Sequence, residues 1–334
     1  MICFTLLLIP MPLFGLLMLS TVFTEDVLGL TARSRSRIRY PRSTTGMPQD
    51  RQQTYSNPQG TTLTQIRPDV WLGERPFFPT LPGLTTTDVA CKMAVVKLPN
   101  NEGLWIHSPV ALDQKLQNAL EKLGPVTHIV TPNTEHLNYA ADWIRAYPDA
   151  MSYAPPGLRQ RKPNIGWDVE IGCKQQPDVD GSTTSSIWTS EVPEAWGGVI
   201  TACWIDRERL PLVGKQFFSE VVFSHIPSKT LFVTDLWWNY PDTAADIESG
   251  DDTDTIVVPT NSRLWKKVMD KVYKPIYNNL LQGSEYLERM QVVFDWDWEY
   301  LAPCHGEPIE GTECKAILAR HLGYDWNQQE GTLQ

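Results

Sequence analysis

From about residue 70 onward, short apolar runs alternate with longer stretches of helical spacing along this chain. Apolar and β-branched runs bounded by turn residues are typical of strands. The predicted strands are Val70–Leu72, Cys91–Leu98, Leu104–His107, Val126–Val130, Met151–Ala154, Val199–Trp204, Glu220–Ser224 and Thr230–Thr234. The residues Asn100-Asn101-Glu102-Gly103 predict a hairpin turn between two of them.

Helices are predicted where apolar residues recur on one face. The clearest is Asp113–Leu123, in which Leu116, Leu120 and Leu123 share a face and Gly124 is the stop signal. The others are Leu137–Ala146, Gly311–Leu322 and Arg263–Leu281, the last kinked or broken near Pro275. Strand-rich stretches separated and followed by helices predict an α/β fold, a four-layer αββα sandwich.

The first 62 residues do not fit this pattern. Met1–Phe23 is uncharged and apolar but contains Pro10 and Pro12, which favours a signal peptide over an uncleaved membrane anchor. The following residues are rich in Arg, Ser and Thr, as in transit peptides. We therefore expect residues 1–62 to be a targeting leader and linker that directs the chain to a plastid. The alternatives are the secretory pathway and membrane anchoring. Residues 63–325 would form the domain and residues 326–334 a short tail. Polar residues 174–190 and acidic residues 243–255 are predicted loops.

Charge and cysteine content narrow the function classes. The formal net charge is −10, and because residues 1–60 are basic, the remainder is more acidic than the whole. An acidic body repels phosphate backbones, which argues against nucleic acid as a partner. Membrane contact is expected only through the N-terminal segment. The six cysteines are widely spaced with no C-x-x-C pair, which favours reduced thiols in a core over a disulfide framework.

Candidate metal ligands follow three predicted strands. Glu135 and His136 lie in the first of these segments, residues 126–143 (VTHIVTPNTEHLNYAADW). Asp235 comes directly after an apolar run in the second, residues 220–239 (EVVFSHIPSKTLFVTDLWWN). YLAPCHGEP, residues 300–308, ends in His305-Gly306, where the glycine permits a tight turn. Imidazole and carboxylate groups are ligands of zinc and iron.

These segments resemble the metal-site segments of metallo-β-lactamase-fold hydrolases, such as ribonuclease Z and hydroxyacylglutathione hydrolase. That fold carries H-x-H-x-D-H after a strand, a metal-bridging Asp after a later strand, and a final His-Gly turn. Here the first motif is damaged, and two registers are open. One places Pro132, Thr134, His136 and Leu137 at the ligand positions; the other places Thr131, Asn133, Glu135 and His136 there. The resemblance implies one divalent metal at most, zinc or iron, held by His136, Asp235 and His305 with Glu135 or water.

Three further residues are predicted around this site. Lys215 stands where the fold normally has a ligand histidine, and His107 stands near its loop beneath the metal. Together with Asn133 these are the expected pocket residues. Cys304 neighbours His305, but adjacent side chains usually point apart, which argues against Cys304 as a ligand.

A longer string of motifs resembles an uncharacterised family, domain-of-unknown-function family 4336. The string includes LWIHSP, GPVTHIVTPN-x-x-H, YPDA, APPGL and the late CHG, over about residues 70–322. The predicted function is a degenerate metallo-hydrolase acting on a small molecule such as an ester or phosphoester. The alternative is a non-catalytic binding or scaffold protein that keeps the fold without metal chemistry.

Overall fold

The structure is a computed structural model, and it describes residues 54–76, 90–171, 192–211, 214, 216–240, 255–257, 266–267 and 269–334. All of them belong to one compact unit, Gln52–Gln334. The predicted leader up to residue 53, the polar loop 174–190 and most of the acidic loop lie outside the described residues. Within the described part of the chain, no helix has the length and apolar character needed to cross a membrane.

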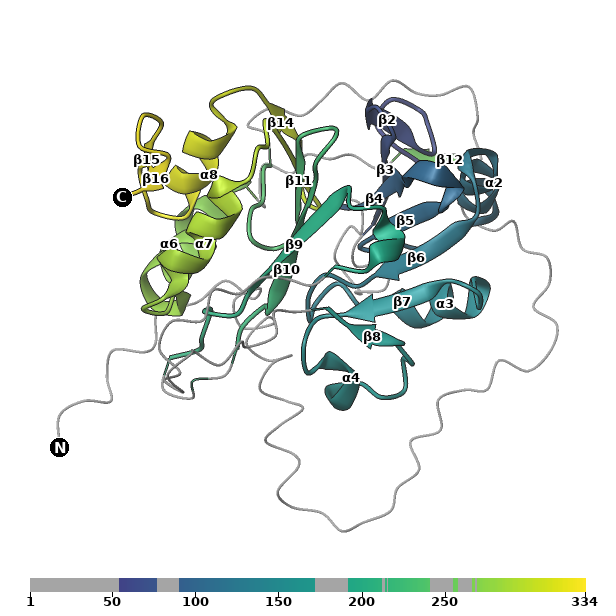
Figure 1. The fold of residues 1–334 in the computed structure, drawn as a ribbon, viewed down its shortest axis with the longest axis horizontal. Helices are drawn as coiled ribbons and strands as arrows, with labels where there is room; N and C mark the ends of the chain where they lie inside the picture. The colour runs from purple at the N-terminus through teal and green to yellow at the C-terminus, as the bar shows by residue number, and fades with distance from the viewer. Residues whose placement is uncertain are drawn as a thin grey trace, which may run out of the picture. The chain divides into compact units, whose positions relative to one another are not determined.

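The first sheet has seven strands in the order β2-β3-β4-β5-β6-β7-β8 (Figure 1). Its strands are β2 (Thr64–Arg67), β3 (Val70–Pro76), β4 (Ala90–Lys97), β5 (Leu104–His107), β6 (Val126–Val130), β7 (Met151–Ala154) and β8 (Val169–Glu170). Pairing is antiparallel from β2 to β5 and parallel from β5 to β8.

The second sheet has five strands in the order β14-β13-β11-β10-β9. They are β9 (Ile200–Ile205), β10 (Glu220–His225), β11 (Thr230–Val233), β13 (Tyr300–Pro303) and β14 (Ile309–Glu310). Neighbours β11 and β13 are parallel, and the other pairs are antiparallel. The carboxyl ends of β11 and β13 therefore meet at one edge of the sheet.

The two sheets face each other across one hydrophobic core. Trp105 of β5 is fully buried, and its ring lies 5.2 Å from that of Phe223 in β10 and 6.0 Å from that of Phe232 in β11. Trp196, also fully buried, packs edge-on to Trp105. Because burial of apolar area is the main stabilising term in folding, this aromatic layer fixes how the sheets stack.

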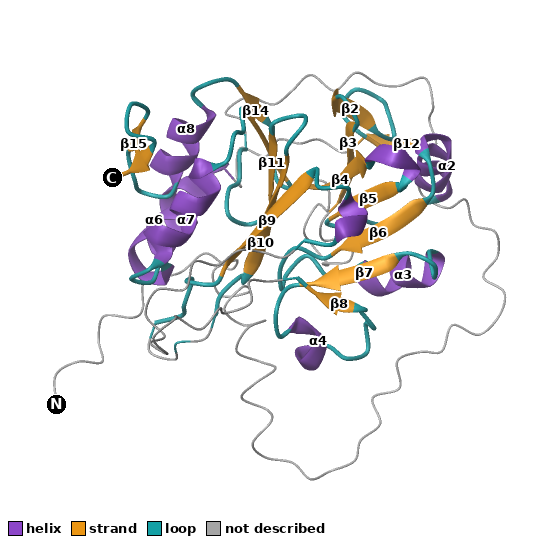
Figure 2. Cartoon of the chain, in the orientation of Figure 1, coloured by secondary structure: helices purple, strands orange, loops and turns teal. Residues whose placement is uncertain are grey.

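Helices cover the outer faces of both sheets (Figure 2). Beside the first sheet lie α2 (Gln114–Leu123), α3 (Ala140–Ala146) and the short α4 (Leu158–Arg161); beside the second lie α6 (Lys274–Ile276), α7 (Tyr286–Asp295) and α8 (Cys314–His321). Short 3-10 turns span Pro99–Asn101 and Glu194–Trp196. The order of layers is helix, sheet, sheet, helix, which confirms the predicted αββα sandwich.

Several helices differ from the prediction, among them α8, which begins at Cys314 rather than Gly311. The helix α3 begins at Ala140 rather than Leu137. The helix expected to be kinked or broken near Pro275 is helical on both sides of it, with π-helical turns at Met269–Tyr273 and Tyr277–Leu281 flanking the proline, whose N–H is missing from the ladder. The helix α7 was not predicted.

The packed chain extends past the predicted domain bounds at both ends. Asn57, within the predicted linker, is buried and donates from Nδ2 to the Leu72 carbonyl at 3.0 Å. Strands β1 (Thr54–Ser56) and β12 (Thr255–Val257) pair in parallel. The predicted tail forms a hairpin of β15 (Trp326–Asn327) and β16 (Thr332–Leu333), and the Leu333 N–H donates to Gln291 Oε1 of α7 at 3.0 Å.

Candidate metal centre

His136, Asp235 and His305 converge on one point. Each lies in the segment that follows a strand, β6, β11 and β13 respectively, and they are 4%, 2% and 0% exposed. His136 Nε2 lies 3.2 Å from His305 Nε2 and 3.5 Å from an oxygen of Asp235. The other Asp235 oxygen lies 3.7 Å from His305 Nε2. The sequence therefore identified a set of side chains that the fold brings together.

The spacing of these atoms fits a metal ion. Bonds of about 2.0–2.1 Å in a tetrahedral site place neighbouring ligand atoms about 3.3–3.4 Å apart. The separations of 3.2 to 3.7 Å in the structure bracket that value. Two imidazole nitrogens and a carboxylate are donors that zinc and iron accept, so the residues present fit one divalent ion.

The far nitrogen of each histidine is held by a hydrogen bond. His305 Nδ1 lies 2.8 Å from the Ala90 carbonyl, which can only accept, so Nδ1 carries the proton and Nε2 presents its lone pair to the centre. His136 Nδ1 lies 2.8 Å from Ser108 Oγ. Such bonds fix ring orientation and tautomer, as they do around metal-binding histidines.

The charges at the centre suit a cation. Burial opposes a charge on His136, but Cys91 and Asp235 raise its pKa well above the usual range. Burial and the charge on His136 together lower the pKa of His305. Burial likewise disfavours ionised Asp235, yet His136 beside it lowers the pKa of that carboxyl. The three groups thus favour one bound proton, on His136, and a divalent ion would replace that proton.

A second layer of polar groups positions Asp235. Asn133 is fully buried and donates from Nδ2 to Asp235 at 2.6 Å, while its Oδ1 accepts the His136 N–H at 2.8 Å. Glu220 accepts three successive backbone N–H groups, those of Thr234, Asp235 and Leu236, at 2.6, 2.9 and 2.9 Å. The predicted pocket residue Asn133 is therefore a bridge between two ligands, and Glu220 is a positioning residue that the sequence reasoning missed.

The other predicted members do not join the centre. Glu135 is half-buried, and it is absent from both groups of converging metal-ligand atoms found among the described residues. His107 lies between the sheets, stacked 5.7 Å from Trp105, and burial lowers its pKa to about 3, as expected of a neutral core histidine. Lys215 lies outside the described residues.

The remaining positions of the damaged motif hold the loop in place. Thr131 Oγ1 accepts from Trp167 Nε1 at 2.9 Å, the Pro132 carbonyl accepts the Val221 N–H at 2.8 Å, and the Thr134 N–H donates to the Phe218 carbonyl at 3.2 Å. These bonds tie the loop after β6 to the neighbouring segments. They supply no second set of metal ligands there.

An aromatic group lies against His305. The Trp238 ring is 4.6 Å from that of His305, and it stacks 5.6 Å from the Tyr273 ring. Tyr240 packs edge-on to Trp238 at 6.2 Å. Trp238 Nε1, Tyr240 OH and Tyr273 OH are buried and have no hydrogen-bond partner among the described residues. These three groups are therefore hydrogen-bond donors beside the centre that no described residue uses.

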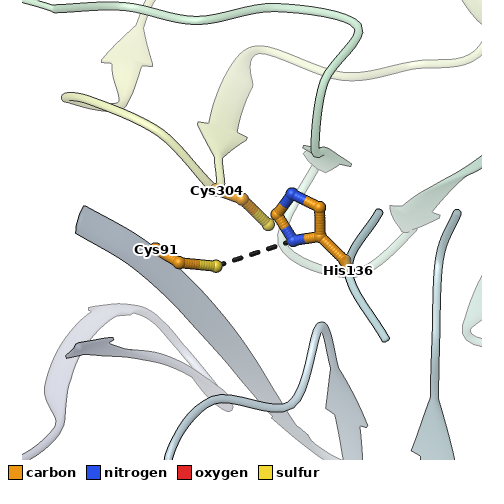
Figure 3. A group of neighbouring side chains, drawn as sticks. All are labelled: Cys91, His136 and Cys304. Atoms are coloured by element: carbon orange, nitrogen blue, oxygen red, sulfur yellow. Dashed lines mark hydrogen bonds between the residues drawn. The ribbon is translucent and has the colours of Figure 1, made fainter. Parts of the chain in front are cut away.

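Two cysteines also reach His136. Cys91, Cys304 and His136 place their ligand atoms within 4.8 Å of one another (Figure 3). Cys304 was expected to point apart from His305 and not to be a ligand; its Sγ nevertheless belongs to a group that shares His136. The four described cysteines, Cys91, Cys203, Cys304 and Cys314, are buried, and none forms a disulfide with another described residue.

A family profile with the description "Domain of unknown function (DUF4336)" matches residues 76–280, more than half of the chain. A search of curated proteins finds no match.

Similar solved structures include a metallo β-lactamase from Hirschia baltica, at 9% identity and a TM-score of 0.47, covering 78% of this chain and 96% of that one. Another is a metallo β-lactamase from Erythrobacter litoralis, at 12% identity and a TM-score of 0.44, covering 78% and 94%. A third is the Flv1 flavodiiron core from Synechocystis sp. PCC6803, at 7% identity and a TM-score of 0.48, covering 78% and 59%. The fold assignment itself rests on the two sheets and their flanking helices.

Proposed function

The chain belongs to the family of unknown function DUF4336, and from this premise we propose that it is a one-metal, degenerate metallo-hydrolase with a metallo-β-lactamase-like sandwich. The observation that carries the proposal is the convergence of His136, Asp235 and His305 at tetrahedral spacing. Only one such set of nitrogen and oxygen donors occurs among the described residues, which supports one ion rather than two at this centre.

The ion, zinc or iron, would be held by Nε2 of His136, Nε2 of His305 and the carboxylate of Asp235. Bound there, it would supply a Lewis acid that lowers the pKa of water to about 7. The protein's own groups do the rest. Asn133 and Glu220 orient Asp235, and Ser108 and the Ala90 carbonyl orient the two imidazoles.

The aromatic group suggests the class of ligand. Trp238 Nε1 can only donate, and the hydroxyls of Tyr240 and Tyr273 are free to donate. Carbonyl and phosphoryl oxygens accept such bonds, which supports a small ester or phosphoester. Leaving each group unpaired costs about 1–3 kcal/mol, so a ligand or water that pairs them is favoured.

The non-catalytic alternative is favoured by one observation, the near-complete burial of all three ligands. Structural metal sites are closed, whereas catalytic ones keep an open position. In that case the chain would bind metal without turning over a substrate.

The test uses the full-length chain, with metal per chain measured by mass spectrometry. We expect Asp235→Ala and His305→Ala to bind about one equivalent less than wild type. His225→Gln, which changes a buried histidine bonded to Ser228 away from the centre, should leave the content unchanged. Equal metal in wild type and Asp235→Ala would refute the site.

Hydrolysis of p-nitrophenyl esters and phosphodiesters by the same proteins then separates the two functions. Turnover by wild type that Asp235→Ala abolishes supports the hydrolase. Bound metal with no turnover of either substrate supports the non-catalytic protein.

We also propose that residues 1–62 target the chain to a plastid, the secretory route and a membrane anchor being the alternatives. The composition of the leader supports this proposal. N-terminal sequencing of the mature protein tests it, because an intact Met1–Phe23 segment would contradict cleavage.

A further inference from the structure

His136 presents its two ring nitrogens to different sets of donors. Nε2 faces Asp235 and His305, whereas Nδ1 lies 3.6 Å from Cys91 Sγ and 2.8 Å from Ser108 Oγ. Cys304 Sγ completes a second group whose ligand atoms lie within 4.8 Å of one another. Figure 3 shows both thiols directed toward the His136 ring, one from strand β4 and one from the segment after β13.

We propose that Cys91, Cys304 and Nδ1 of His136 form a second, thiolate-based site for a soft divalent ion such as zinc. His136 then lies between two ion positions, one rich in nitrogen and oxygen and the other rich in sulfur. The proposal goes beyond the proposed hydrolase function and shares only His136 with it.

The spacing supports coordination. A tetrahedral ion with bonds of about 2.3 Å to sulfur and about 2.0–2.1 Å to nitrogen places those two atoms about 3.5–3.6 Å apart. The distance from Cys91 Sγ to His136 Nδ1 is 3.6 Å. Two thiolates on one ion would be about 3.8 Å apart. The two sulfur atoms lie within 4.8 Å of each other, which is compatible with that spacing.

Burial and charge support it as well. Cys91, His136 and Cys304 are 5%, 4% and 3% exposed. Two thiolates with one divalent ion form a neutral group, which can be buried at far lower cost than an unpaired charge. Thiolates are also the ligands that select soft ions over magnesium or calcium.

Ser108 would adjust when the ion binds. Its backbone has a φ of 55°, a left-handed conformation uncommon for serine, and its hydroxyl lies 3.7 Å from Cys91 Sγ. When Nδ1 turns from hydrogen bonding to coordination, the hydroxyl can donate to the Cys91 thiolate instead.

A small pocket leads to this group. It is lined by Cys91, Pro109, Val110, His136, Asn138 and Tyr139, and its volume of about 10 Å³ is close to that of one water molecule. Because Cys91 and His136 both line this pocket, a water molecule in it would be placed to serve as a fourth ligand.

Cobalt titration of the reduced, metal-free full-length chain tests the site. Cobalt bound to thiolate gives an intense near-ultraviolet charge-transfer band that nitrogen and oxygen ligands do not give. We expect this band in wild type and in Asp235→Ala, which keeps the sulfur site. We expect the double variant Cys91→Ser/Cys304→Ser to lose the band and about one equivalent of cobalt. Cys203→Ser, which changes a buried cysteine outside the group, should retain both.

The outcomes separate the two metal sites. If the band is lost in the double variant and kept in Asp235→Ala, the sulfur site is supported, whether or not Asp235 binds a metal ion. Wild type that binds cobalt without the band, or a band that survives the double variant, overturns it. If the double variant fails to fold, X-ray absorption of the cadmium-loaded wild type decides: two sulfur neighbours support the site, and nitrogen and oxygen alone overturn it.

Discussion

Gly306 fixes the turn that carries His305, and replacing it with alanine should damage the metal centre through the backbone. The residue has a φ of +85°, and a Cβ built on it would lie 2.0 Å from the Asn239 carbonyl oxygen and 2.8 Å from the Tyr240 nitrogen. An ordinary contact begins at 3.4 Å, so the two segments would have to separate by about 1.4 Å.

The expected loss of unfolding free energy has two parts, the backbone strain at residue 306 and the hydrogen bonds that the separation weakens. A left-handed φ costs a non-glycine residue about 1–2 kcal/mol. Two backbone hydrogen bonds join the segments, from Asn239 N–H to the His305 carbonyl and from Glu307 N–H to the Asn239 carbonyl. Weakening both adds about 1–2 kcal/mol, so Gly306→Ala should lose about 2–4 kcal/mol of unfolding free energy. Displacing His305 should weaken zinc binding about 10–100-fold, as changes in the groups that orient ligands do.

Gly311→Ala is the matched control. Gly311 also has a positive φ, +115°, but a Cβ there meets nothing within 4 Å. It should lose only the conformational term of about 1–2 kcal/mol and bind zinc like wild type. Unfolding in urea of the metal-free proteins and zinc competition against a chelator measure both quantities. Equal zinc affinity in Gly306→Ala and wild type would refute the claim that this turn positions His305.

Two further predictions concern buried ionisable groups outside the set of candidate metal ligands. Burial raises the pKa of Glu208 from 4.5 to about 8. The unfolding free energy is therefore unaffected by this group below pH 4.5, and it falls by about 1.4 kcal/mol per pH unit as the pH rises from 4.5 toward 8, because the unfolded state loses the proton first. Urea unfolding from pH 5 to 9 should show that Glu208→Gln removes this loss, while exposed Glu121→Gln keeps it; parallel profiles would contradict the assignment. Asp113 caps α2 through the Leu116 N–H at 2.8 Å and pairs with buried Arg75 at 3.2 Å. Asp113→Asn keeps the cap but removes the ion-pair partner of Arg75, and it should still cost about 3–5 kcal/mol in thermal or urea unfolding; a loss of about 1 kcal/mol or less would mean that this ion pair contributes little.

Much of the fold could be predicted because periodicity and turn residues act locally. Leu104–His107 and Val126–Val130 are strands over the predicted residues, and Asp113 and Gly124 bound the helix between them. The helix α7 was missed although Tyr286, Met290, Val293 and Phe294 are buried at helical spacing. That signal was present in the sequence, but the acidic and aromatic residues around it obscured the pattern.

The site could be predicted only in part. Asp235 and His305 follow neighbouring parallel strands, so their meeting follows from strand order once the sheet is known. The roles of Glu220 and Cys91 could not be read from the sequence, because each depends on contacts between segments distant along the chain. The position of His107 between the sheets could not be read from the sequence either, because its burial depends on Phe223 and Phe232 in the opposite sheet.

The structure also favours one register of the damaged motif. Leu137 packs with Ala140 and Leu158 in a separate apolar cluster, away from the centre, so it does not occupy a ligand position. Asn133 faces the centre and bonds Asp235, as expected if Thr131, Asn133, Glu135 and His136 hold the four positions. Thr131 and Asn133 then form hydrogen bonds where ligand histidines would stand. Those bonds and the core between the sheets therefore hold the loop after β6 in place. Of the three candidate ligands, Asp235 carries the buried negative charge that a cation would balance, and its carboxylate lies 3.5 Å from His136 Nε2 and 3.7 Å from His305 Nε2.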